Sequence, residues 1–127
     1  MQPLKLLVNY TTRGRKDRFF DGMESIYNNC AKPEHMRVLI SCDLDDTEMN
    51  NPDVVKRIAE YQNTYLIFGT STGKINAINR DLDILPDDFA DYDVLVNFSD
   101  DQRFTVWGWD EYIRTDFNQL DLSYYVA

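Results

Sequence analysis

Short apolar runs alternate with amphipathic stretches along the whole chain. Four runs have the length and composition of buried strands, and they span Leu4 to Tyr10, Arg37 to Cys42, Thr64 to Phe68 and Asp93 to Phe98. Near-continuous apolar strands joined by helices are typical of a parallel sheet that is covered on both faces. The pattern therefore predicts an α/β fold, a three-layer sandwich around a mainly parallel central sheet.

The stretches between the strands have apolar residues at helical spacing. The first predicted helix has Asp17 as its expected N-cap, and Pro33 ends that region. A second helix is expected to begin at Asn51 and Pro52, which suit an N-cap and the first helical position. Two further helices are expected, one over Ile75 to Leu82 and one over Asp110 to Phe117. The second helix is expected to turn these residues inward: Val54, Val55, Ile58 and Ala59.

Length and charge narrow the class of protein. The 127 residues suit one domain, spanning 1–127. With 22 acidic against 13 basic residues, the net charge of −9 argues against binding to a nucleic-acid backbone. No apolar run is long enough to cross a membrane, and no long apolar leader follows Met1. With only two cysteines, Cys30 and Cys42, the chain suits the reducing cytoplasm, and a disulfide between them is not expected in that compartment. The apolar tail, Leu120 to Val126, could cover a sheet edge or join two copies into a homo-oligomer.

Polar residues collect where the predicted strands end. Right-handed crossovers bring the carboxyl ends of parallel strands to one edge, where open α/β sheets bind ligands. Adjacent carboxylates at Asp100 and Asp101 suit Mg²⁺ or Mn²⁺ with a diphosphate as co-ligand. A solvated acidic turn is the alternative. The remaining polar residues at this edge are Thr11, Arg13, Asp43, Asp45, Asp46 and the segment 69–74.

The acidic stretch at Asp43 allows three interpretations. It is an acidic turn, or Asp43 accepts a hydrogen bond from a nucleotide base, or Asp43 is a nucleophile and Asp45 a general acid/base. The last pattern resembles the first motif of haloacid-dehalogenase-like phosphatases, an apolar strand followed by Asp-x-Asp-x-Thr. The glycine-rich segment 69–74 is not a Walker A motif, because Ile75 stands where a Ser or Thr should follow Lys74.

The order of the motifs resembles the nucleotide-sugar-binding half of a GT-A glycosyltransferase of the family-2 type. That order is strand–Thr-x-Arg, strand–Asp, Gly-x-Ser-x-Gly-Lys-x-x-Ala-x-Asn-Arg and strand–Ser-Asp-Asp. The resemblance implies a Rossmann-like fold, a nucleotide-diphosphate sugar as donor and Mn²⁺ or Mg²⁺ as cofactor. By this resemblance Asp101 would bind the metal, and Asp100 would contact the metal, ribose or sugar. The other implied donor-site residues are Thr11, Arg13, Asp43, Lys74, Asn79 and Arg80.

The resemblance leaves the second substrate and the base open. The acceptor could be a saccharide, a lipid or a protein, and the chain is expected to lack a full acceptor-binding half. A non-catalytic nucleotide-sugar-binding module is a further alternative to a transferase. Asp110 and Glu111, the nearest carboxylates after the metal motif, are expected at an exposed helix start. Trp107 and Trp109 either stack on a sugar or close the edge of the core.

Overall fold

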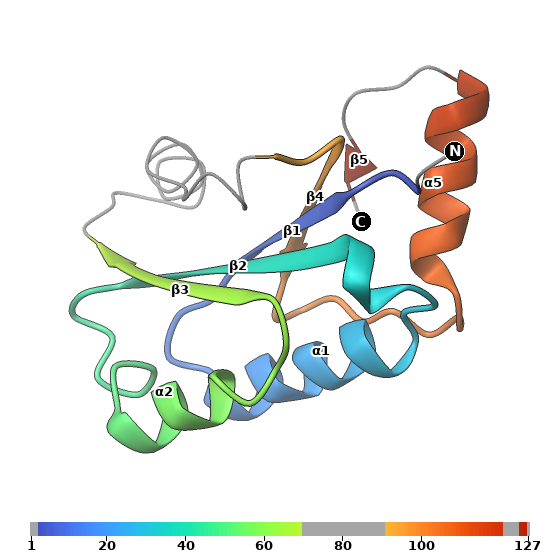
Figure 1. Ribbon diagram of the computed structural model, residues 1–127. Helices are drawn as coiled ribbons and strands as arrows, with labels where there is room; N and C mark the ends of the chain where they lie inside the picture. The colour runs from blue at the N-terminus through green and yellow to red at the C-terminus, as the bar shows by residue number, and fades with distance from the viewer. Residues whose placement is uncertain (1–2, 70–90, 121–124, 127) are drawn as a thin grey trace.

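The computed structural model describes residues 3–69, 91–120 and 125–126, and these form a parallel sheet with helices packed against it (Figure 1). The helices are α1 (Lys16–Asn28), α2 (Pro52–Ile58) and α5 (Trp109–Leu120), with a 3₁₀ turn at Pro33–His35. The strands are β1 (Leu6–Thr11), β2 (Met36–Asp43), β3 (Thr64–Gly69), β4 (Val94–Ser99) and β5 (Tyr125–Val126). The predicted α/β class is confirmed.

The strands lie in the order β3-β2-β1-β4-β5, and every adjacent pair is parallel. The central strand is therefore β1, which pairs with β2 on one side and β4 on the other. From β1 the chain adds β2 and β3 in one direction, and it later adds β4 and β5 in the other. This reversal is a topological switch point, and it lies between the carboxyl ends of β1 and β4. The tail contributes β5, as its apolar composition suggested.

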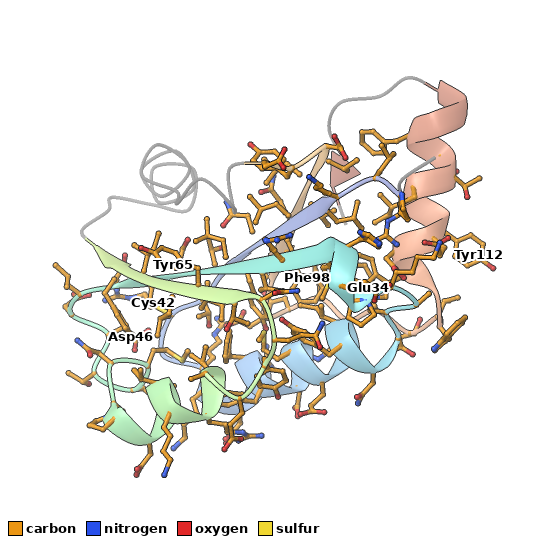
Figure 2. All side chains as sticks on the ribbon, in the orientation of Figure 1. Glu34, Cys42, Asp46, Tyr65, Phe98 and Tyr112 are labelled. Carbon is orange, nitrogen blue, oxygen red and sulfur yellow. The ribbon has the colours of Figure 1, made fainter. Side chains whose placement is uncertain are left out.

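One face of the sheet packs against the helices. Its side chains come from alternate positions of the strands, such as Val8, Ile40 and Phe98, and they meet α1 and α2 beneath the sheet (Figures 1 and 2). Tyr10 is fully buried on this face between the rings of Phe19 and Phe98, at centroid distances of 4.8 and 4.9 Å. Among the described residues, this face holds the larger of the two buried apolar clusters.

The opposite face carries a second buried apolar cluster, of Leu7, Leu39, Ile67 and Leu95. Because side chains alternate along a strand, Asn9 lies on this face beyond Leu7. Asn9 is fully buried, and its amide makes no hydrogen bond with any residue in the described ranges. The burial of this face fits a covered sheet. The third layer of the predicted sandwich, with the helix expected over 75–82, lies outside the described residues and stays a prediction.

Two details of the predicted helices are wrong. Asp17 is not the N-cap of α1, because the helix begins at Lys16 and the Arg15 carbonyl already accepts a hydrogen bond from the Phe19 amide at 2.8 Å. In α2, Val55 and Ala59 are exposed. The helix is only seven residues long, so a single i, i+4 stripe, Val54 and Ile58, reaches the core. The predicted cap is confirmed, since the Asn51 side chain accepts from the Asp53 amide at 2.9 Å.

Asp110 is also not the exposed residue expected at a helix start. It has no accessible surface, and its carboxylate accepts hydrogen bonds from the amides of Ala31 and Lys32 at 2.7 and 3.0 Å. One turn later, Arg114 pairs with the same carboxylate and donates to the Leu4 carbonyl at 2.8 Å. This buried pair ties α5 to the segment after α1 and to the start of the sheet.

The two tryptophans of the Trp-Gly-Trp sequence have different environments. Trp109 closes an edge of the core: its ring stacks on Phe104 at 3.9 Å, and its indole N–H donates to the Ile26 carbonyl. Trp107 is 68% exposed. Between them Gly108 has φ +81°, which a glycine adopts without strain and which sends the two rings in different directions.

Neither cysteine is joined in a disulfide, as expected, and both are buried. Burial, with the nearby Asp110 carboxylate, raises the pKa of the Cys30 thiol to about 12, so that thiol stays protonated. Within the described part of the chain, no helix has the length and apolar content to span a membrane.

Candidate functional site at the carboxyl edge of the sheet

The loops that follow β1 and β4 meet at the switch point. The Thr12 hydroxyl donates to Asp100 Oδ2 at 3.1 Å, although the two residues are 88 positions apart in the sequence. Both side chains are buried, with Asp100 7% exposed. Arg103 fixes the same loop by donating to the carbonyl oxygens of Asp100 and Arg18, at 2.7 and 3.0 Å. Asp100 is therefore held in place, below the surface of the edge.

Asp101 is the exposed member of the acidic pair. Two arginines from the start of α1 donate to its Oδ1 atom, Arg15 Nη1 at 3.0 Å and Arg18 Nη1 at 3.0 Å. Arg15 Nη1 also lies 3.5 Å from Asp100 Oδ1. The acidic pair of the β4 loop is thus balanced by two guanidinium groups of the β1–α1 segment.

A second ion pair joins the β1 and β2 loops. Arg13 Nη1 donates to Asp43 Oδ2 at 2.5 Å and to Asp45 Oδ1 at 2.9 Å. Its Nη2 group donates to the other Asp45 oxygen at 3.2 Å, which makes the contact with Asp45 bidentate. These hydrogen bonds and the charge of Arg13 lower the pKa of Asp45, so this carboxyl stays ionised at neutral pH.

Gly14 lies between Arg13, which pairs with the β2 loop, and Arg15, which pairs with the β4 loop. Its φ of +61° turns the chain, so that Arg13 faces the β2 loop and Arg15 faces the β4 loop. The Gly14 amide donates to Asp46 Oδ2 at 2.7 Å, and the other oxygen of that carboxylate accepts from the Met49 amide at 3.2 Å. Asp46 is 5% exposed and lies beyond the end of β2 (Figure 2). Asp46 therefore joins the β1 loop at Gly14 to the segment after β2 at Met49.

The structure brings together four of the sequence-predicted site residues, in two pairs: Arg13 with Asp43, and Asp100 with Asp101. Thr11 lies at the end of β1, half-buried, opposite Ser41 and Ser99 in the strand register. It is on the face of the sheet that carries Asn9, away from α1. Lys74, Asn79 and Arg80 lie outside the described residues.

Several residues at this edge lie outside the motifs of the sequence. Arg15 and Arg18 are three positions apart, a spacing that puts both on one side of a helix start, and this was the available signal. Thr12, directly after Thr11, faces Asp100 because consecutive strand residues point to opposite faces. Arg103 donates to backbone carbonyl groups, and its role depends on a loop shape that no short motif encodes. Asp46, by contrast, was expected at this edge, and it accepts hydrogen bonds from backbone amides.

Asp100 and Asp101 could supply some of the ligands of a cation whose other ligands come from a bound molecule or water. In the described ranges, no three His, Cys, Asp or Glu side chains converge as a protein-only metal site would require. Mg²⁺ commonly binds through one or two carboxylates and completes its shell with phosphate oxygens and water. Exposed Asp101, with Asp100 beside it, fits that incomplete oxygen donor set.

No protein-family model matches the chain, and neither a curated protein nor a solved structure matches it significantly.

Proposed function

We propose that this chain binds a nucleotide-diphosphate sugar at the carboxyl edge of its sheet, with a divalent cation at Asp100 and Asp101, and acts as a glycosyltransferase or its donor-binding domain. The observation that carries the proposal is the meeting of the β1 and β4 loops across the switch point, where Thr12 holds Asp100 and leaves Asp101 exposed. Open α/β sheets bind nucleotides at this position. The motif order that resembles GT-A enzymes gives the same assignment.

Each described residue has a role in this proposal. Asp101 is the principal cation ligand, and Asp100, held by Thr12, contributes its remaining oxygen or contacts the sugar. Thr11 and the Arg13–Asp43 pair contact the nucleoside. When bound, the cation would neutralise the charge that develops on the leaving diphosphate. Arg15 adds positive charge beside the same group.

The phosphatase alternative is less well supported. That mechanism needs Asp43 as a nucleophile and Asp45 as a proton donor, but Arg13 binds both carboxylates and lowers the pKa of Asp45. An ionised Asp45 cannot donate a proton. Asp43 is also on β2, one strand away from the switch point. Loss of phosphomonoester hydrolysis in Asp43→Asn would be required to revive this alternative.

Replacing Asp101 by alanine should weaken the cation-dependent binding of a nucleoside diphosphate. We expect UDP or GDP with Mn²⁺ to raise the melting temperature of the wild-type chain, because a ligand of the native state stabilises it. In Asp101→Ala the affinity should fall by about tenfold to a hundredfold, which corresponds to the loss of one charge-assisted contact. Isothermal titration with and without Mn²⁺ measures this change.

Asp91→Ala is the matched control. It removes one exposed carboxylate that pairs with Lys5 at the opposite edge of the sheet, before the starts of β1 and β4. It should leave nucleotide binding unchanged. Equal nucleotide affinity with and without Mn²⁺ in the wild-type chain would contradict the metal-dependent site. Cation-dependent binding with no sugar transfer to saccharide, lipid or protein acceptors would instead favour a binding module.

A further inference from the structure

The carboxylate proposed to bind the cation is engaged by two arginines. Arg15 and Arg18 both donate to Asp101 Oδ1 at 3.0 Å, so their Nη1 atoms lie no more than about 6 Å apart. All three side chains are more than half exposed. The contacts are therefore surface ion pairs, which are weak enough for an incoming ion to replace.

A cation and the two arginines cannot share this carboxylate at low cost. A divalent ion at Asp101 Oδ1 would lie within a few ångströms of two guanidinium charges, and like charges at that separation repel even in water. The arginines must then turn away or find another anion. A diphosphate bound to the same cation supplies one, because guanidinium groups bind phosphate oxygens in the geometry in which they bind carboxylates.

We infer that Arg15 and Arg18 are the internal counter-ions of Asp101 in the free protein, that a divalent cation displaces them, and that the diphosphate of the ligand then receives them. This inference rests on the proposed function and adds an exchange of ion pairs to it. It makes cation and diphosphate binding cooperative, since each ligand frees the group that the other one needs. By linkage, each ligand raises the affinity for the other by the same factor.

The exchange is tested first with the metal alone. Mn²⁺ is titrated into the wild-type chain, Arg15→Ala, Arg18→Ala and the double variant, and the free ion is followed by electron paramagnetic resonance. Removing an arginine that competes for Asp101 should tighten Mn²⁺ binding by about five- to tenfold, and by more in the double variant. Lys56→Ala removes an exposed positive charge on α2 and should not change the affinity.

The anion is tested separately, with pyrophosphate in the presence of EDTA. Asp101→Asn removes the internal competitor, so pyrophosphate should bind more tightly than to the wild-type chain. The double variant Arg15→Ala/Arg18→Ala should bind it more weakly. Asp101 substitution is thus expected to strengthen metal-free anion binding, although it should weaken metal-dependent nucleotide binding. If the ion pairs of Asp101 had only a structural role, the same substitution would weaken both metal-free pyrophosphate binding and metal-dependent nucleotide binding.

The outcomes separate this inference from the proposed function. Arginine variants that bind Mn²⁺ no more tightly than wild type would overturn the exchange, even if nucleotide binding depends on Mn²⁺. Tighter Mn²⁺ and weaker pyrophosphate binding in those variants, without nucleotide binding by the wild type, would support the exchange and reject the proposed donor. Absence of Mn²⁺ binding in every variant would overturn both.

Discussion

Replacing Asp110 by alanine should lower the free energy of unfolding by about 3–5 kcal/mol, the usual cost of removing one partner of a buried ion pair. The carboxylate has no accessible surface and binds Arg114 and the amides of Ala31 and Lys32. Its loss leaves the Arg114 guanidinium, itself only 4% exposed, without that counter-ion. Urea denaturation followed by circular dichroism measures the change.

Two further variants test the physical cause. Arg114→Met in the Asp110→Ala background should recover part of the loss, because it removes a buried guanidinium left with only the partly exposed Glu111 carboxylate, at 2.6 Å, as an ion-pair partner in the described ranges. Asp91→Ala removes an exposed carboxylate paired with Lys5 and should leave the free energy of unfolding nearly unchanged. Similar losses of unfolding free energy in Asp110→Ala and Asp91→Ala would show that burial does not strengthen the Asp110–Arg114 ion pair.

Asp110→Ala should also change how the free energy of unfolding depends on pH in acid. Burial alone would raise the pKa of Asp110, but hydrogen bonds from the Ala31 amide, Arg114 and the Lys32 amide outweigh burial and lower it. A carboxyl whose pKa is lower in the folded state stabilises the fold above its unfolded pKa of about 3.9, and this contribution is lost as the pH falls through the folded value. Asp110→Ala should therefore lose stability less steeply than wild type below about pH 4.

Gly22→Ala should destabilise the protein by about 1–3 kcal/mol, the range for inserting a methyl group into a filled core. A Cβ atom at Gly22 would lie 2.2 Å from the Tyr10 hydroxyl oxygen. The tyrosine cannot move aside, since it is enclosed by Phe19 and Phe98 and its hydroxyl donates to the Phe19 carbonyl at 3.0 Å. The better helix propensity of alanine offsets only part of this cost.

A double-mutant cycle identifies the clash. In a Tyr10→Phe background the hydroxyl is absent, and the next nearest atom is the ring carbon Cζ at 3.0 Å. The cost of Gly22→Ala should then shrink by at least half, measured by denaturant unfolding of all four proteins. An unchanged cost in that background would point to the helix backbone and not to the contact between α1 and β1.

The sheet could be predicted from the sequence because four of its strands are nearly continuous apolar runs, and β1 to β4 agree with their predictions to within two residues at either end. Burial in the helices was harder to predict. Val55 belongs to an apolar pair in sequence but lies outside the narrow stripe of a short helix. Asp110 stands at a helix start, where acidic residues are usually exposed, but it is buried. Arg114, one turn later, was the sequence signal that Asp110 has a partner.

The candidate site was predictable as a place more than as a set of contacts. Parallel strands bring their carboxyl ends together, so the meeting of Arg13 with Asp43 and of the β1 loop with Asp100 follows from topology. Which arginine binds which carboxylate depends on the turn at Gly14, and a turn of this kind is set by tertiary contacts such as the one with Asp46. Sequence spacing does not encode those contacts.

The place of β1 at the centre of the sheet has a consequence for synthesis of the chain. Its first neighbour, β2, follows after one helix, but its second neighbour, β4, begins only at Val94, with 50 residues between it and the end of β2 at Asp43. Until then the most buried strand of the finished protein is an open edge, with backbone groups available to pair with other chains. An unpaired β1 edge is therefore an aggregation hazard in the nascent chain, and pairing with β4 removes it.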